Sequence, residues 1–152
     1  MPATFIAEMD VFPKGPGEAV GGLRYFGRML DKMRLFASGK LHSDYHANMG
    51  KKRSMDGLLC NFLWINYDDL RRRVLEGGAD EEILKWCYQK GRPLNEGDLL
   101  VWNAFVNKFG WNDFATPTVE RRKKELGISD RADIQTMGDL FDYEEGRRGS
   151  DR

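Results

Sequence analysis

One stretch of the chain, GKLHSDYHANMGKKRS at residues 39–54, combines more chemically active side chains than any other. It holds both histidines of the protein, together with an aspartate, a tyrosine, an asparagine and three consecutive cations. These residue types are suited to metal binding, to acid–base catalysis and to anion binding. A polar loop that merely connects two helices is the alternative to all three.

A metal site in this stretch would use His42, Asp44 and His46. In an extended segment these side chains alternate onto one side and can converge on an ion, whereas in a helix Asp44 points away. We expect an extended segment, because Gly39 is placed to end the preceding helix. Structural zinc, however, usually takes four ligands and favours thiolates, and both cysteines of the chain lie elsewhere. The sequence therefore predicts no metal and no other cofactor, with these three side chains as the candidates if an ion binds.

An acid–base site would use His46 as the base, with Asp44 to orient it and Tyr45 beside them. Histidine is the commonest general base, and a carboxylate often holds it in place. Neighbouring positions do not bring side chains face to face, and the chain lacks a nucleophile motif such as GxSxG. Catalysis by His46 and Asp44 is therefore the second interpretation and not the first.

An anion site would lie where the segment NMGKKRS leads into a helix that begins near Ser54. Free backbone N–H groups and the helix dipole favour negative charge at such a start, and three cations stand directly before it. The spacing is not that of a Walker phosphate loop, and a solvated basic loop would have the same composition. The candidate binding residues are Asp44, Tyr45, His46, Asn48, Lys51 and Lys52.

The remainder of the chain predicts the helices that must position this stretch. Apolar residues step by three and four, as in amphipathic helices, along residues 21–39, 54–65, 66–78, 79–91, 95–110, 116–127 and 130–143. Asn66 and Asn95 are suited to cap two of these helices, and Thr116 with Pro117 to begin another. No segment alternates with a period of two, so no sheet is expected. The predicted fold is all-α, a compact irregular bundle of six or seven helices.

The two ends of the chain depart from this helical pattern. Residues 1–20 are rich in proline and glycine and predict an extended arm, whose apolar residues, Phe5 and Ile6 among them, can lie across the body. Residues 21–143 form the single helical domain expected at this chain length. Residues 144–152 are mostly charged and predict a flexible tail.

Charged residues within the predicted helices are interpreted as surface groups. Arg24, Arg28 and Asp31 share one face of the first helix, a spacing typical of exposed ion pairs. The runs RRR at 71–73 and RRKK at 121–124 predict solvated helix faces.

Composition excludes several classes of partner. Lysine plus arginine and aspartate plus glutamate both number 24, so the net charge is zero and no nucleic acid is expected. No segment approaches the roughly 20 apolar residues of a membrane span, and the first residues lack the features of a signal peptide, so no membrane is expected. Cys60 and Cys87 lie in apolar helical patterns and are expected to be reduced, which predicts a cytoplasmic location.

Three stretches, GGLRYFGRMLDKMR, DYHANMG and WNAFVNKFGWND, follow one another in that order. In these stretches the chain resembles a bacterial family of small proteins, domain of unknown function number five thousand and sixty-nine. The resemblance covers residues 21–142. It implies a bacterial origin and an all-helical fold, and it brings no activity, cofactor or catalytic residue.

The leading functional hypothesis is a small cytoplasmic helical binding module for an anionic small molecule or a protein partner. The alternative hypothesis is an enzyme that uses His46 and Asp44 in acid–base or metal-assisted chemistry. A third interpretation is a protein whose role is carried by its arm and tail within an oligomer.

Overall fold

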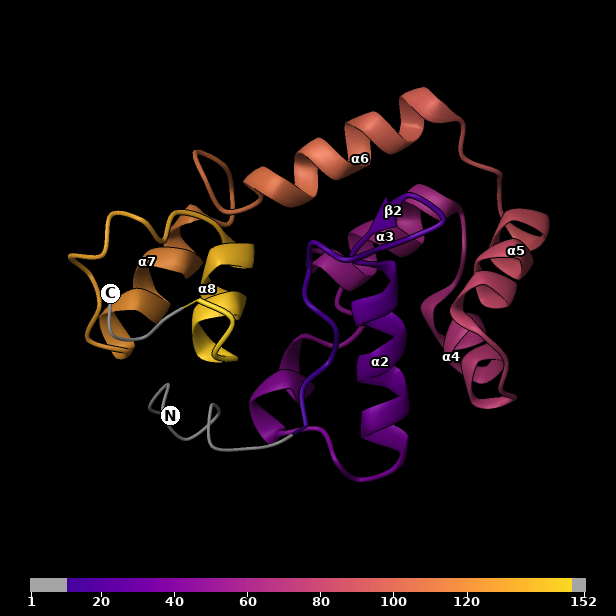
Figure 1. The fold of residues 1–152 in the computed structure, drawn as a ribbon, viewed down its shortest axis with the longest axis horizontal. Helices are drawn as coiled ribbons and strands as arrows, with labels where there is room; N and C mark the ends of the chain where they lie inside the picture. Colours follow the sequence, from indigo (N-terminus) through magenta and orange to yellow (C-terminus); the bar gives the residue numbers. More distant parts are fainter. Residues whose placement is uncertain (1–10, 149–152) are drawn as a thin grey trace.

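The computed structural model describes residues 11–148 as two groups of short helices joined by one long helix (Figure 1). The first group consists of α2 (Phe26–Ala37), α3 (Met55–Leu63), α4 (Tyr67–Leu75) and α5 (Asp80–Lys90). The second consists of α7 (Thr116–Glu125) and α8 (Met137–Glu144), and the joining helix is α6 (Glu96–Lys108). The predicted all-α fold is confirmed, with seven α-helices among the described residues.

The starts of several helices follow from their capping residues. Asn66 and Asn95 accept hydrogen bonds from the backbone N–H groups three residues later, as expected, at 3.1 and 2.9 Å. Ser54 and Thr136 cap α3 and α8 in the same way. No helix of the described residues is long and apolar enough to cross a membrane.

The expectation that the chain has no sheet is wrong at one short hairpin. β1 (Ala19–Val20) pairs antiparallel with β2 (Leu23–Arg24). Gly21 and Gly22 form the turn with φ angles of 55° and 81°, the left-handed region that a two-residue hairpin of this kind requires. Two residues per strand are too few to produce an alternating pattern, so only the Gly-Gly pair in the sequence indicates the turn. As a consequence α2 begins at Phe26, after the hairpin.

Two further expectations are corrected by the loops. Residues 43–48 are not extended but form a short 3₁₀ helix, η1 (Ser43–Asn48), which begins after His42 accepts a hydrogen bond from the Asp44 backbone N–H. The last helix begins at Met137 and not near residue 130. The segment before it is a loop whose carbonyl oxygens, those of Arg131 and Ile134, accept hydrogen bonds from the Lys123 ammonium.

The hydrophobic core is divided into two clusters, one for each group of helices. The larger cluster is centred on α2, where Phe26, Met29, Leu30 and Met33 are completely buried. A smaller cluster packs beneath α7 and α8 and consists of Ile128, Ile134, Leu140 and Tyr143. Side chains of α6 hold the hairpin in place: Asn103 bonds to the backbone of Gly22 and Arg24, and Trp102 donates to the Arg24 carbonyl.

The ends of the described segment pack against the helices. Lys14 donates both its backbone N–H and its ammonium to Asp31 on α2. The predicted boundary of a flexible tail at residue 144 is wrong for Glu144 and Glu145, since both are buried and ion-paired. Residues 1–10 of the predicted arm, Phe5 and Ile6 included, and residues 149–152 of the predicted tail lie outside the described residues.

Candidate functional site

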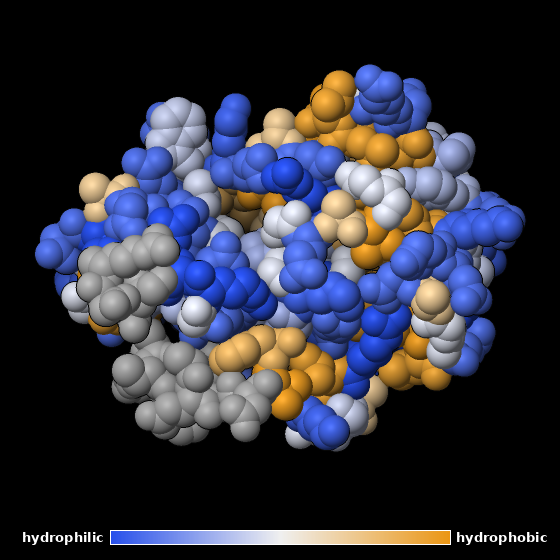
Figure 2. Space-filling view, viewed as in Figure 1, coloured by the Kyte–Doolittle hydropathy of each residue, from blue (hydrophilic) through white to orange (hydrophobic). Residues whose placement is uncertain are grey.

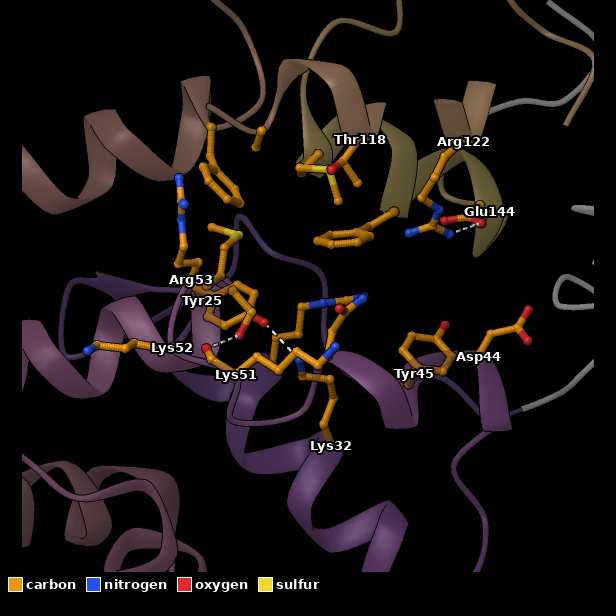
Figure 3. A pocket seen from close by; sticks show the side chains of 18 of the residues that line it. Tyr25, Lys32, Asp44, Tyr45, Lys51, Lys52, Arg53, Thr118, Arg122 and Glu144 are labelled. Carbon is orange, nitrogen blue, oxygen red and sulfur yellow. Dashed lines mark hydrogen bonds and ion pairs between the residues drawn. The ribbon is translucent and has the colours of Figure 1, made fainter. Parts of the chain in front are cut away.

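A cavity of about 620 Å³ lies between the two groups of helices. One side is formed by α2, η1 and the loop that leads into α3, and the other by the end of α6, α7 and α8 (Figure 3). Figure 2 shows mainly hydrophilic residues around a hollow in the face of the molecule, with hydrophobic residues visible inside it. The stretch 39–54 therefore forms part of the wall of a cavity.

Three exposed cations, Lys51, Lys52 and Arg53, line the cavity on the side of the loop. None of them forms an ion pair with any residue between 11 and 148. The Arg53 guanidinium instead lies over the ring of Phe114, 4.6 Å from its centre. The rim of the cavity therefore carries three cations without a carboxylate partner among the described residues.

The wall opposite these cations is largely apolar. It is formed by side chains from the end of α6, the α6–α7 loop, the start of α7 and the first two turns of α8: Phe109, Phe114, Ala115, Met137 and Phe141. The rings of Phe109 and Phe114 pack at 5.6 Å between centres, in a tilted arrangement. Together with Met55 these side chains give the cavity an apolar interior beneath its charged rim.

A buried ion pair joins the two groups of helices at the cavity. Arg28 on α2 donates two hydrogen bonds to the Glu145 carboxylate, at 2.9 and 2.7 Å, and both side chains are only 1% exposed. The Tyr45 hydroxyl of η1 donates to the same carboxylate at 2.7 Å. Burial works against ionised Glu145, but the hydrogen bonds and charge of Arg28 hold its pKa below the ordinary value. Burial also raises the pKa of Tyr45, further increased by the charge of Glu145, so the phenol stays protonated as a donor.

A second buried network lies at the base of the cavity, on the α2 side. The Lys32 ammonium contacts the Tyr25 hydroxyl and an oxygen of Asp56, each at 2.8 Å, and Tyr25 donates to that oxygen at 2.7 Å (Figure 3). Burial lowers the pKa of Lys32, an effect that the charge of Asp56 opposes. Burial and the adjacent Asp56 carboxylate raise the pKa of Tyr25. Tyr25 and Lys32 both line the cavity, whereas Asp56 is completely buried behind them.

Glu144 and Arg122 form a third pair, at the α7–α8 side of the cavity (Figure 3). Burial raises the pKa of Glu144 above the ordinary value, although the Arg122 guanidinium partly opposes that effect. Each of the buried or half-buried cations that line the cavity, Arg28, Lys32 and Arg122, therefore has a carboxylate partner. Among the cations that line the cavity, only those of residues 51–53 lack a carboxylate partner within residues 11–148. The exposed Asp44 carboxylate lines the same cavity, 3.6 Å from His42 Nδ1.

The loop that carries these cations is fixed by close contact with α3. The Gly50 backbone N–H donates to the buried Asp56 carboxylate at 3.1 Å, and Ser54 caps the helix. A Cβ atom at Gly57 would lie 2.1 Å from the Lys51 carbonyl oxygen, so the loop backbone packs where only glycine leaves room. Asp56 thus links the loop to Lys32 at the base of the cavity.

Five of the six predicted binding residues line this cavity: Asp44, Tyr45, Asn48, Lys51 and Lys52. His46 does not. Its Nε2 atom lies 3.0 Å from the Leu41 carbonyl oxygen, and its ring packs edge-on against Phe36. No hydrogen bond or ion pair joins His46 to Asp44 within residues 11–148, so the structure does not assemble the acid–base pair considered from the sequence.

The candidate metal ligands His42, Asp44 and His46 do not converge on one point, because His46 contacts a different partner from the other two. His42 Nδ1 accepts from the Asp44 backbone and lies 3.6 Å from an Asp44 carboxylate oxygen, while His46 faces Leu41. Among residues 11–148 no group of three histidine, cysteine, aspartate or glutamate side chains is placed to hold a metal ion. The three side chains fail to converge because residues 43–48 form the 3₁₀ helix η1. In an extended segment alternate side chains would have pointed to the same side.

Sequence reasoning missed several residues of the site. The sequence predicts an exposed ion pair for Arg28 and a solvated helix face for Arg122, yet Arg28 is buried and Arg122 lines the cavity. For Arg28 one signal is present, since the apolar residues Met29 and Leu30 follow it directly on the helix. For Arg122 and Glu144 the local sequence holds no such signal.

The fold and the site together define a small, mainly helical protein with a cavity between two groups of helices and a cationic rim. The family model described as a domain of unknown function (DUF5069) matches residues 10–147, and the chain belongs to this family. The resemblance noted in the sequence is thereby confirmed. No curated protein matches the chain.

Proposed function

We propose that the protein is a small binding module and that its ligand is a small anionic molecule held in the cavity. The observation that carries this proposal is the charge arrangement at the cavity. Arg28, Lys32 and Arg122 each have a carboxylate partner, whereas Lys51, Lys52 and Arg53 line the same cavity and pair with no carboxylate between residues 11 and 148. Three adjacent cations without partners are mutually repulsive, and an anion at this place relieves the repulsion.

The starts of two helices add to the positive potential. Ser54 and Met55 at the start of α3, and Ala115 and Thr118 at the start of α7, all line the cavity. The N-terminal end of a helix carries a partial positive charge, which favours an anion by about 0.3–1 kcal/mol at exposed sites. This contribution acts in the same direction as the side-chain charges.

The shape of the site favours a small molecule over a protein partner or nucleic acid. The cations surround a concave cavity of about 620 Å³ and do not spread over a flat face. The whole chain has no net charge, which does not favour a long polyanion. Cys60 and Cys87 are both buried free thiols, which fits the reducing cytoplasm that we propose as the location.

Thermal unfolding of the full chain tests this proposal. Inorganic phosphate should raise the melting temperature at constant ionic strength, because a ligand that binds only the native state stabilises it by mass action. A phosphate concentration of about 100 times its dissociation constant adds about 2.7 kcal/mol. Replacing phosphate by chloride at equal ionic strength separates binding from general screening.

Two double variants then locate the effect. Lys51→Ala with Lys52→Ala should reduce the phosphate-induced shift, whereas Lys85→Ala with Lys90→Ala should leave it unchanged. The second pair is a matched control, because both lysines are exposed on α5 and do not line the cavity. Equal losses from both variants would mean nonspecific charge effects, and the absence of a shift with phosphate would reject the site.

A further inference from the structure

We infer that the ligand is an amphipathic anion, with a compact anionic head and an apolar acyl or aromatic body. This inference rests on the proposed function, which requires only a small anion, and it names the chemical class of that anion. Three properties of the cavity lead to it: its size, the separation of its charged and apolar walls, and the paired state of its buried charges.

The size of the cavity exceeds what an inorganic anion needs. A volume of about 620 Å³ lies within the roughly 300–1,000 Å³ that is typical of pockets for drug-sized organic molecules. A phosphate ion bound at the cations would leave most of that volume in contact with phenylalanine and methionine side chains. An apolar group that displaces water from walls of this kind gains binding free energy, because apolar surface on both partners is removed from water.

The charged and apolar walls come from different parts of the chain. The unpaired cations belong to the loop before α3, whereas Phe109, Phe114 and Met137 belong to the second half of the sequence. The labelled side chains of Figure 3 show Lys51 and Arg53 on the lower side of the cavity and Thr118 on the upper side. A ligand that contacts both walls must therefore present its charge toward one and its apolar body toward the other.

Arg53 and Phe114 mark the place where the two walls meet. The guanidinium lies 4.6 Å from the ring centre, and the Phe114 ring is 49% exposed. A half-exposed aromatic ring next to a cation offers a flat surface on which an apolar body can pack while its anionic end reaches the guanidinium. Phe109, which packs against Phe114, continues this surface into the buried part of the cavity.

The buried charges make a second charged group on the ligand body unfavourable. Arg28 is bound by Glu145, and Lys32 is bound by Asp56 and Tyr25. These groups therefore offer polar atoms without net charge to whatever occupies the cavity. A ligand charge placed there would lose its hydration without gaining an opposite charge.

Isothermal titration calorimetry of the full chain with short probes tests the inference. Octanoate should bind more tightly than butyrate, by up to about fourfold for each added methylene. Octanol and octylamine, which keep the body but lose the negative charge, should bind at least about tenfold more weakly than octanoate. Octyl phosphate, compared with octanoate, distinguishes a phosphate head from a carboxylate head, and tight binding of either supports the inference.

Variants of the two walls should differ in their effect on octanoate and on phosphate. Ala115→Leu and Thr118→Leu add bulk to the apolar side and should weaken octanoate binding more than they reduce the phosphate-induced thermal shift. Lys51→Gln with Arg53→Gln should weaken both, and Lys85→Gln with Lys90→Gln should weaken neither. Folding of each variant is checked by its circular dichroism spectrum before titration.

The outcomes separate this inference from the proposed function. If phosphate stabilises the protein but octanoate binds no more tightly than butyrate, the site takes a small anion and the amphipathic class is wrong. If octanol binds as tightly as octanoate, the cations do not recognise the head and the inference is also wrong. If no anion binds at all, the proposed function fails first.

Discussion

Arg28 and Glu145 lie 117 positions apart in the chain and meet as a bidentate ion pair at the cavity between the two groups of helices. Arg28 also donates to the Lys14 carbonyl at 3.1 Å and lies over the ring of Phe141 at 4.5 Å. A single guanidinium thus connects the first described residues, α2 and the end of α8. The pair fixes how the two walls of the cavity face one another.

Removing one partner of this pair should destabilise the protein strongly. Arg28→Met removes the bidentate partner of the buried Glu145 carboxylate and leaves it with Arg147 and the Tyr45 hydroxyl. Breaking a buried ion pair typically costs about 3–5 kcal/mol, and we expect the lower end of that range because Arg147 still compensates the charge. Replacing both partners, by Arg28→Met with Glu145→Leu, removes the buried carboxylate together with its bidentate partner and should restore part of that loss. Urea denaturation of the wild type, both single variants and the double variant measures the coupling. Additive losses would show that the two side chains do not act as a pair.

Local patterns in the sequence predict the α-helices of the fold, but they do not predict the hairpin, η1 or the contacts of Arg28. Helix starts at Ser54, Asn66 and Asn95 depend on residues within three positions of the cap, so local patterns are sufficient to find them. The partner of Arg28 lies 117 positions away, and no local spacing indicates it. Charged residues on helices are usually exposed, which is why the surface interpretation was the natural one.

For the candidate site too, the residues that are close together in the sequence could be predicted, and those that come from distant parts of the chain could not. The loop stretch was singled out because its residue types are concentrated there, and Asp44, Tyr45, Asn48, Lys51 and Lys52 do line the cavity. The facing wall of phenylalanine and methionine side chains has the composition of ordinary core. Only the packing of α7 and α8 opposite η1 makes that wall part of a cavity, and no pattern within the loop predicts it.

The second buried network predicts a similar loss at Lys32. Lys32→Met leaves Asp56 with hydrogen bonds from Tyr25 and the Gly50 backbone but without an opposite charge. We expect a loss of about 3–5 kcal/mol in the free energy of unfolding. Lys40→Met is the control, because Lys40 is exposed and forms no ion pair among the described residues, and it should change stability by less than about 0.5 kcal/mol. Chemical denaturation at neutral pH distinguishes the two, and equal small effects would mean that Asp56 does not need its cation.

Glu144 and Glu145 are neighbours whose pKa values are shifted in opposite directions. The pKa of Glu145 lies below the ordinary value of 4.5, because the Arg28 bonds outweigh burial, so its stabilisation is present above pH 4.5 and is lost as the pH falls through the folded pKa. Burial raises the pKa of Glu144, so its contribution is present below pH 4.5 and is lost as the pH rises through the folded pKa.

Denaturation of Glu144→Gln and Glu145→Gln across the acid range should therefore give opposite trends. The stability deficit of Glu145→Gln relative to the wild type should shrink as the pH falls below 4.5. The stability of Glu144→Gln relative to the wild type should increase as the pH rises from 4.5 toward neutrality. Parallel trends in the two variants would contradict the assignment of opposite shifts.

Gly57 lets the cationic loop pack against α3, and the substitution Gly57→Ala should displace that loop. The new Cβ would lie 2.1 Å from the Lys51 carbonyl oxygen and 2.8 Å from the Lys52 Cα atom, so the backbone that carries both lysines must move. Such overpacking typically costs about 1–3 kcal/mol. It should also reduce the phosphate-induced rise in melting temperature, because the cations no longer lie at the cavity.

Gly97→Ala is the matched control, since Gly97 is also in the first turn of a helix but is exposed, and its nearest non-neighbouring atom would be an Asn95 side-chain oxygen at 3.4 Å. Alanine is the better helix former by about 1 kcal/mol, so this variant should match or exceed the wild type in stability and keep the full phosphate response. Thermal unfolding with and without phosphate measures both quantities. A normal phosphate response in a folded Gly57→Ala protein would show that the packing of this loop does not position the cations for binding.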